Sequence, residues 1–136
     1  MKVREINSLT EKTYVLKLED IISFEPGQYI MLGLNGQMRE YSIYNGRNER
    51  LEILIREVDN GVVSKKLRKL NKGDEVDFAG PYGEFIIKND LRKYHIFVAT
   101  GTVISPFRSF VRSYDLDYKM IHGVRYANEN YGKNDF

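Results

Sequence analysis

The stretch "REYSIY", residues 39–44, combines three chemically useful side chains on a segment with the pattern of a strand. Successive side chains of a strand point to opposite faces, so Arg39 and Tyr41 share one face while Glu40 and Ser42 share the other. An arginine pairs with anions, a tyrosine ring can lie on an aromatic group, and a serine offers a short polar contact. A half-exposed strand with a surface arginine is the structural alternative, and the neighbouring motifs must decide between them.

The stretch "DNGVVS", residues 59–64, is a turn followed by the start of a helix. Backbone N–H groups at a helix start lack intrahelical partners and favour anions, so a phosphate could lie against Val62, Val63 and Ser64. Most helices begin in this way, and Ser64 is also an ordinary capping residue. The signal becomes informative only in combination with others.

The stretch "ATGTVISPF", residues 99–107, follows an apolar strand and opens a helix. Gly101 permits a tight turn and close backbone approach, while Thr100 and Thr102 can supply hydroxyl groups, as a loop that binds a dinucleotide requires. The spacing does not match the full G-x-G-x-x-G pattern. Taken alone, the stretch predicts a turn between a strand and a helix.

The composition is that of an ordinary globular chain of 136 residues, with 42% hydrophobic and 29% charged residues. Cysteine is absent, which excludes disulfides, thiolate metal sites and cysteine nucleophiles within this chain. His95 and His122 lie in apolar strands without metal-ligand spacing, so we expect no metal site. Any redox chemistry must therefore use an organic cofactor.

The net charge of +2 is too small for a dedicated nucleic-acid binder. No apolar run is long enough to span a bilayer, and "MKVREINSLTEKT" has no apolar core of a secretory signal. We expect a cytoplasmic protein that binds neither membrane nor nucleic acid. Motifs of common hydrolases and kinases are also absent from the sequence.

The first part of the chain, residues 1–90, is predicted to consist of short strands separated by turns rich in glycine and asparagine. Such a density of strands favours a small closed antiparallel barrel or a sandwich. Val63, Leu67 and Leu70 recur at helical spacing, which predicts one short helix within residues 61–70. The predicted strands are "VREIN", "TYVLKLED", "QYIMLGL", "REYSIY", "LEILIREV" and "DEVDFAG".

The second part, residues 91–136, has the order strand, turn, helix and strand that begins a parallel α/β unit. We predict strands at 94–100 and 118–124 and a helix at 105–114. Two strands and one helix cannot cover both faces of a parallel sheet. We therefore expect an incomplete segment, from a fragment or a truncated gene product, that ends at "NENYGKNDF" where a further helix should begin.

Six stretches, in this order and spacing, resemble the ferredoxin/flavodoxin–NADP reductase family. The resemblance implies a six-stranded antiparallel flavin-binding barrel with one short helix over residues 1–90. An incomplete parallel α/β nucleotide-binding segment over 91–136 follows it. FAD is the expected cofactor, FMN less so, and NADPH the expected substrate. The six stretches are "FEPGQYIMLGL", "REYSIYN", "DNGVVSKKLRKLNKGDEV", "GPYGEF", "ATGTVISPFRSF" and "HGVRY".

The resemblance also implies roles for the flavin-binding strand. Arg39 would contact the flavin pyrophosphate, Tyr41 would stack on the isoalloxazine ring, and Ser42 would hydrogen-bond near its reactive nitrogen. Tyr41 and Ser42 are thus the expected catalytic residues, and Glu40 belongs to the same cofactor-binding stretch.

The two helix-start motifs receive roles in the same way. Val62, Val63 and Ser64 would hold the pyrophosphate, and Thr102 would face both the flavin and the nicotinamide. The expected NADP-binding residues are Thr100, Gly101 and Arg125, of which Arg125 would meet the 2′-phosphate.

Ferredoxin or flavodoxin, both acidic electron carriers, are the expected partners, and the incomplete end of the chain could pair two copies into a homodimer. The basic run within residues 65–72 is either a solvated helix face or a docking patch for such a carrier. Three alternatives remain open: the reductase component of an oxygenase, a flavin-binding module with impaired NADPH turnover, and a small oligonucleotide-binding barrel.

Overall fold

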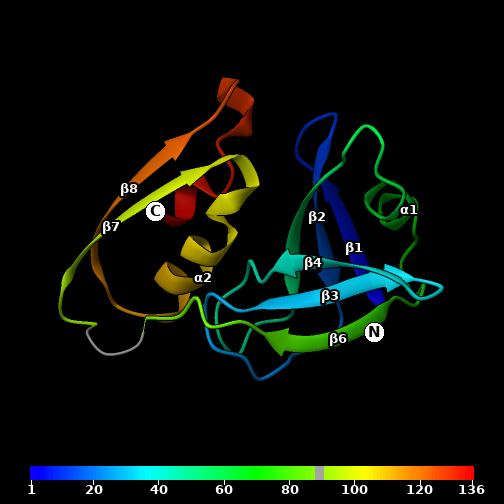
Figure 1. Ribbon diagram of the computed structural model, residues 1–136, viewed down its shortest axis with the longest axis horizontal. Coiled ribbons are helices and arrows are strands. Elements are labelled where there is room, and N and C mark those ends of the chain that lie inside the picture. The colour runs from blue at the N-terminus through cyan, green and yellow to red at the C-terminus, as the bar shows by residue number, and fades with distance from the viewer. Residues whose placement is uncertain (88–90) are drawn as a thin grey trace.

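The computed structural model describes residues 1–87 and 91–136, and its chain folds into two parts that pack against each other (Figure 1). The predicted boundary between residues 90 and 91 adjoins residues 88–90, which lie outside the described residues. The first part contains six strands and one helix: β1 (Val3–Ser8), β2 (Thr13–Leu18), β3 (Tyr29–Leu34), β4 (Gln37–Ser42), β5 (Glu52–Arg56), α1 (Val63–Arg68) and β6 (Asp77–Tyr82).

The six strands of the first part form two antiparallel sheets, in the orders β1-β2-β5 and β4-β3-β6. Backbone hydrogen bonds join the two sheets at both margins. On one side the Tyr44 N–H donates to the Glu52 carbonyl at 3.0 Å, and on the other the Val76 N–H donates to the Met1 carbonyl at 2.9 Å. The predicted six antiparallel strands and short helix are confirmed. Across the described residues, the two sheets meet through such bonds rather than through one continuous ladder.

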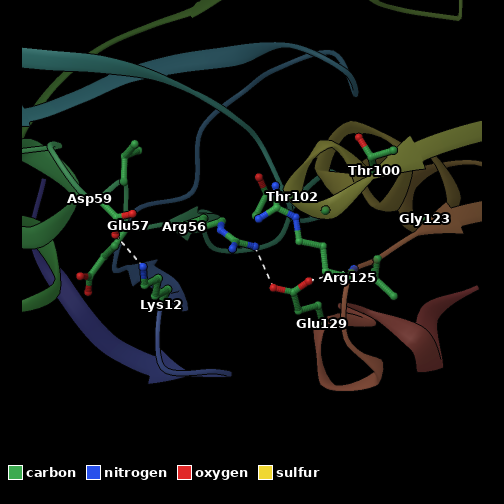
Figure 2. Close-up of a pocket in the computed structure, with 12 residues that line it drawn as sticks. Lys12, Arg56, Glu57, Asp59, Thr100, Thr102, Gly123, Arg125 and Glu129 are labelled. Carbon is green, nitrogen blue, oxygen red and sulfur yellow. Dashed lines mark hydrogen bonds and ion pairs between the residues drawn. The ribbon is translucent and has the colours of Figure 1, made fainter.

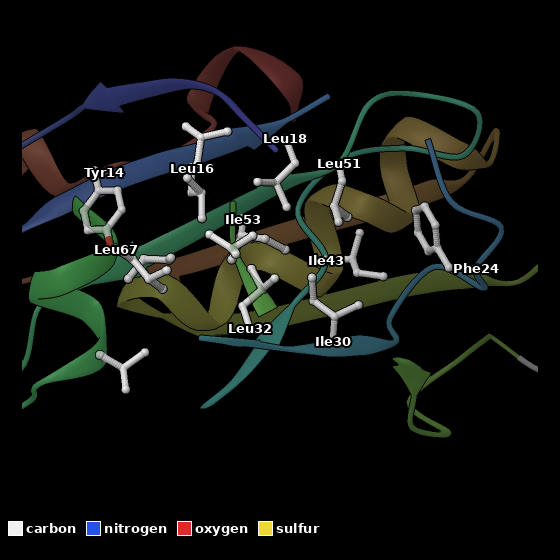
Figure 3. Close-up of a cluster of buried hydrophobic side chains, with 14 residues drawn as sticks. Tyr14, Leu16, Leu18, Phe24, Ile30, Leu32, Ile43, Leu51, Ile53 and Leu67 are labelled. Carbon is white, nitrogen blue, oxygen red and sulfur yellow. The ribbon is translucent and has the colours of Figure 1, made fainter. Parts of the chain in front are cut away.

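Alternating apolar side chains fill the space between the two sheets (Figure 3). From β2, Tyr14, Leu16 and Leu18 are all fully buried, and Leu67 of α1 closes one end of the cluster. Each buried leucine or isoleucine contributes about 1.5–3 kcal/mol when removed from water. This core fixes α1 against the sheet that carries β4.

The second part consists of β7 (Tyr94–Thr100), the 3₁₀ turn η1 (Gly101–Ile104), α2 (Ser105–Ser113) and β8 (Asp117–Gly123). Strands β7 and β8 are parallel, with Thr100 opposite Gly123 at their carboxyl ends, as the strand, helix and strand order predicted. Pro106 occupies the first turn of α2, where its missing N–H costs nothing.

A second apolar cluster joins the two parts. Val15 of β2 and Leu54 of β5 are paired neighbours on the outer face of their sheet, and they lie in one cluster with Phe107 and Phe110 of α2. Strand β2 is therefore buried on both faces, one toward the barrel interior and one toward α2. The α/β part thus packs on the barrel through side chains rather than through a shared sheet.

The last residues do not form the α-helix that the sequence was expected to begin there. They form two 3₁₀ turns, η2 (Ala127–Glu129) and η3 (Lys133–Asp135), separated by Gly132 at φ +67°. Asparagine and glycine favour turns over helices, and Gly132 adopts the left-handed region that few other residues accept. A buried hydrogen bond of 2.9 Å from the Tyr131 hydroxyl to Thr13 Oγ1 fastens this segment to β2.

None of the helices in residues 1–87 and 91–136 has the length and apolar character needed to cross a membrane.

Candidate functional site

Strand β4 presents Arg39 and Tyr41 on one face, as the alternation predicted. They lie opposite Leu32 and Ile30 of β3, whose side chains belong to the barrel core. Tyr41 is half-buried against that core, and Arg39 is exposed at its margin. Burial raises the pKa of the Tyr41 hydroxyl, and the nearby Arg39 guanidinium moderates the rise.

Glu40 and Ser42 point to the opposite face of the same strand, where they pair with Met31 and Tyr29. Because β4 is the outer strand of its sheet, both faces border one open edge. A ligand must therefore reach around this edge to contact Tyr41 and Ser42 together.

The residues at the start of α1 lie beside β4. Val62 is 54% exposed, whereas Val63 and Ser64 are buried. Helix α1 packs on β3 and β4, and Lys66 Nζ donates to Gln37 Oε1 at 3.5 Å where the two elements meet. The structure thus brings together the two predicted flavin-binding stretches, which are separated by about twenty residues in the sequence.

Two polar groups in these stretches suit a diphosphate ligand. The Ser64 hydroxyl is buried without a hydrogen-bond partner, although buried hydroxyls are normally paired. The Arg39 guanidinium donates only to the Met38 carbonyl at 2.8 Å and makes no ion pair with any described residue. A hydroxyl without a hydrogen-bond partner and a guanidinium without an ion pair thus lie on two adjacent elements, α1 and β4.

The predicted nucleotide-binding residues gather around one cavity of about 690 Å³ (Figure 2). Thr100, Gly101, Thr102 and Arg125 all line it. The cavity lies at the carboxyl ends of the parallel strands, which is where open α/β sheets bind ligands. The fold thus brings the three predicted NADP-binding residues together with Thr102, which was predicted to face both the flavin and the nicotinamide.

Gly101 shapes the mouth of this cavity. Its φ of +51° favours glycine, and no atom would lie within 4 Å of an added Cβ. His122 Nε2 lies 2.8 Å from the Gly101 carbonyl, and Ser105 Oγ donates to the Thr102 carbonyl at 2.8 Å. These contacts hold the loop in place while leaving open space beside Gly101 for a ligand.

Sequence reasoning missed the part of this cavity that the barrel supplies. Lys12, Arg56, Val58 and Asp59 line it from the first part of the chain, and Glu129 lines it from the last. Lys12 and Asp59 form an exposed ion pair of 2.6 Å, which raises the pKa of Lys12 and lowers that of Asp59. In the sequence, only the position of Arg56 at the end of the strand "EILIR" could have indicated that it lines a cavity. Charged residues are common at strand ends, so this position alone did not predict a site.

The two predicted groups of site residues do not share this cavity. The residues on β4 and at the start of α1 are absent from its lining. The loop between β5 and α1 connects them, because Val58 and Asp59 line the cavity while Val62 precedes α1. The site therefore has two regions. One is formed by β4 and the start of α1, the other is the cavity, and the loop between β5 and α1 joins them.

The sequence is similar to one protein family and to several curated reductases. The family described as oxidoreductase FAD-binding domain matches residues 1–87. The ferredoxin–NADP reductase of Azotobacter vinelandii is 34% identical over 120 residues, which cover 79% of this chain and 46% of that protein. The reductase component of phenol 2-monooxygenase from a Pseudomonas strain is 34% identical over 109 residues, covering 76% and 31%. The chain thus spans less than half the length of these curated relatives.

Solved structures share the fold over nearly the whole chain. The ferredoxin–NADP⁺ reductase of Plasmodium falciparum with 2′-phospho-AMP superposes with a TM-score of 0.86 at 22% identity, covering 98% of this chain and 65% of that one. The Neisseria gonorrhoeae ferredoxin–NADP⁺ reductase with bound FAD and NADP gives a TM-score of 0.75 at 21% identity, covering 98% and 60%. At these identities the likeness establishes the fold, including the barrel followed by a parallel strand pair.

The family match covers more than half of the chain, including the strand and the helix start that carry the flavin-type residues. Together with the fold, this match shows that the chain belongs to the family of oxidoreductase FAD-binding domains.

Proposed function

We propose that this chain is the flavin-binding part of a reductase that moves electrons between NADPH and a ferredoxin or flavodoxin through bound FAD. The observation that carries the proposal is a pair of polar groups on β4 and α1: the Arg39 guanidinium, which makes no ion pair with any described residue, and the buried Ser64 hydroxyl, which has no hydrogen-bond partner there. FAD suits them better than FMN because two groups on separate elements match a diphosphate. When bound, the flavin supplies the redox chemistry, and the protein positions it.

Each predicted residue has a distinct task in this proposal. Arg39 pairs with the pyrophosphate, Tyr41 stacks on the ring system, and Ser42 hydrogen-bonds near the reactive nitrogen. Val62, Val63 and Ser64 contact the pyrophosphate at the start of α1. Glu40 lies on the same strand, but its side chain points to the face opposite Arg39. Of the proposed cofactor-binding residues it therefore has the least structural support.

The nucleotide side of the proposal uses the cavity. Thr100, Gly101 and Arg125 hold the nicotinamide nucleotide, and Thr102 lies between nucleotide and flavin. We place the boundary between the flavin-binding and nucleotide-binding parts at residues 90 and 91. The match to the FAD-binding family ends at residue 87, which supports this division.

The experiment is an absorption spectrum of the purified protein after incubation with excess FAD or, separately, FMN and removal of the unbound flavin by gel filtration. Loss of the stacked ring in Tyr41→Ala should weaken FAD binding by about 0.5–1.5 kcal/mol beyond its buried area. Arg39→Ala should cost about 1.5–3 kcal/mol, because it removes a charge-assisted contact. Arg50→Ala, which removes another exposed arginine, should bind FAD like the unaltered chain. A spectrum without flavin bands would contradict the proposal.

An acidic electron carrier suits the basic surface around α1. Lys65, Lys66, Lys69 and Lys72 are exposed, and the last two make no ion pair with any described residue. Positive patches steer acidic partners and make association sensitive to salt.

A cytoplasmic location fits a chain without cysteine.

The reductase component of an oxygenase is a second candidate, because a relative at 34% identity has that role. The two candidates differ in the electron acceptor, so reduction of a purified ferredoxin and of an oxygenase component should be compared. A flavin-binding module with impaired turnover would bind FAD and pass electrons to neither acceptor.

A homodimer is a further proposal, supported by the outer face of the parallel strand pair. Ile96 and Val98 are each 62% exposed and Ile121 is 49% exposed, although parallel sheets are normally covered on both faces. A second copy could cover this face. Sedimentation velocity tests the proposal, and a single species at the monomer mass would contradict it.

A further inference from the structure

Arg68, the last residue of α1, differs from the other cations of its basic run. Lys65, Lys66 and Lys69 are exposed, whereas the Arg68 side chain is only 21% exposed. Its guanidinium lies over the ring of the fully buried Tyr14, with the central carbon 5.4 Å from the ring centre. Arg68 is therefore directed at the barrel rather than at solvent.

The Arg68 guanidinium donates hydrogen bonds to two segments of the barrel. Its Nη2 donates to Ser8 Oγ at 3.1 Å and to the Thr10 carbonyl at 3.2 Å, and its Nη1 donates to the Glu11 carbonyl. These acceptors belong to the end of β1 and to the turn between β1 and β2. Nη1 also donates to Glu57 Oε1 at 2.8 Å, in the loop that follows β5. One side chain of α1 thus holds the turn and the loop together.

The same turn and loop form one wall of the cavity. Lys12, the last residue of the turn, borders it together with Glu57 and Asp59 of the loop, and we call these three residues the barrel wall (Figure 2). The Glu57 N–H donates to the Lys12 carbonyl at 2.8 Å, and Lys12 Nζ pairs with Asp59 at 2.6 Å. A shift of the turn or of the loop would therefore move all three charged side chains.

The other end of α1 carries part of the proposed flavin-binding stretch. The Tyr14 hydroxyl donates to the Ser64 carbonyl at 2.6 Å, and Lys65 Nζ donates to the Asp59 carbonyl at 2.5 Å. Helix α1 has only six residues and is too short to be stable by itself, so its position depends on such contacts. A displacement of α1 would consequently reach both the flavin-binding stretch and the barrel wall.

We propose that Arg68 is a positioning residue that holds the start of α1 and the barrel wall in one arrangement, so that FAD and NADP⁺ strengthen each other's binding. This inference rests on the proposed function. FAD at the start of α1 restricts the motion of the helix, and through Arg68 it also restricts the barrel wall. The second ligand then loses less conformational entropy on binding. Coupling between two sites is reciprocal, so it can be measured from either ligand.

The test is the release of flavin from the FAD-loaded protein on dilution, followed by flavin fluorescence, with and without saturating NADP⁺. The oxidised nucleotide avoids turnover. In the unaltered chain NADP⁺ should lower the dissociation constant of FAD about fivefold or more, as is typical of coupled sites. Arg68→Met keeps the apolar stem and removes the hydrogen bonds, so the effect of NADP⁺ should fall to about twofold or less.

Lys69→Met is the matched control. Lys69 is the next residue, is exposed and makes no ion pair with any described residue, so this variant should keep the full effect of NADP⁺. The inference is overturned if NADP⁺ does not tighten FAD binding in the unaltered chain. It is equally overturned if Arg68→Met keeps the full effect, or if Lys69→Met loses it to the same extent.

Amide hydrogen exchange measures the positioning without any ligand. The amides of Thr10, Glu57 and Lys66 report on the turn, the loop and α1, because each donates a backbone hydrogen bond there. In Arg68→Met all three should exchange about tenfold faster or more, through the loss of charge-assisted hydrogen bonds. The amides of β7 and β8 should be unaffected. Equal acceleration there would indicate general destabilisation and overturn the inference, as would unchanged exchange at the three amides.

Together the two measurements separate this inference from the proposed function. If FAD is bound but NADP⁺ has no effect on its release, the inference fails and flavin binding stands. If no flavin is bound, the proposed function fails, and faster exchange at the three amides alone would retain Arg68 as the residue that positions the barrel wall.

Discussion

Arg108 of α2 makes more contacts across the two parts than a surface arginine would. Its Nη1 donates to the Tyr44 carbonyl at 2.8 Å and to Glu52 Oε2 at 3.2 Å. Its Nε donates to Asp135 Oδ2 at 2.7 Å, and its guanidinium lies 4.0 Å from the centre of the Tyr44 ring. The side chain is 11% exposed. It therefore joins α2, the barrel and the last residues of the chain at one point.

Arg108→Met keeps most of the apolar stem and removes every one of these polar contacts. Glu52 and Asp135, each 21% exposed, would lose a cation, and the Tyr44 carbonyl would lose a donor. Removing one partner of a buried ion pair costs about 3–5 kcal/mol. Because Asp135 keeps Arg112 at 2.6 Å and water reaches the carboxylates, we expect a loss of about 2–4 kcal/mol in the free energy of unfolding.

The measurement is urea unfolding followed by circular dichroism and by the fluorescence of the ten tyrosines, since the chain has no tryptophan. Arg50→Met is the control, because its pair with Glu19 is long, 3.9 Å, and its side chain is 52% exposed. This control should change the free energy of unfolding by less than about 0.5 kcal/mol. A loss for Arg108→Met as small as that of the control would refute the assignment of Arg108 as a joint between the two parts.

Two further changes test the backbone and the charges. A Cβ at Gly27, where φ is +96°, would lie 1.8 Å from the Phe85 carbonyl oxygen, so Gly27→Ala should yield little folded protein. Gly36→Ala, at φ +75° with open space around it, should stay folded and lose only about 1 kcal/mol; equal yields and melting temperatures would show this reasoning to be wrong. Although burial opposes it, Arg108 and then Arg112 hold the pKa of Asp135 below its usual value, so its stabilisation is present above about pH 4 and is lost as the pH falls through the folded pKa. Melting temperatures of Asp135→Asn should therefore fall less steeply in acid than those of the unaltered chain, and parallel curves would contradict this.

The elements with strong local signals could be predicted from the sequence. The continuous apolar run "YHIFVAT" before a glycine turn predicted a strand of a parallel pair, and β7 spans those residues. The helical spacing of Val63 and Leu67 predicted α1, and both side chains are buried. These predictions succeeded because each pattern involves only residues that are close in the sequence and that bury their side chains on one face of a single strand or helix.

The barrel side of the cavity could not be predicted in this way. Lys12, Arg56 and Glu129 come from a turn, a strand end and a 3₁₀ turn, and only the packing of α2 on β2 and β5 brings these regions together. A charge in each of those places is ordinary in a globular sequence. The conformation of the last residues could not be predicted either. It depends on the hydrogen bond from Tyr131 to Thr13, and these two residues are too far apart in the sequence for any local pattern to connect them.

The double burial of β2 limits how such proteins can be recombined. A barrel cut away from its α/β neighbour would present Val15 and Leu54 to water as an apolar patch. A chimaera that grafts a foreign nucleotide-binding part onto this barrel must therefore inherit a matching pair of aromatic residues for that patch. The exchangeable module is consequently not the barrel by itself but the barrel together with the helix that lies against it.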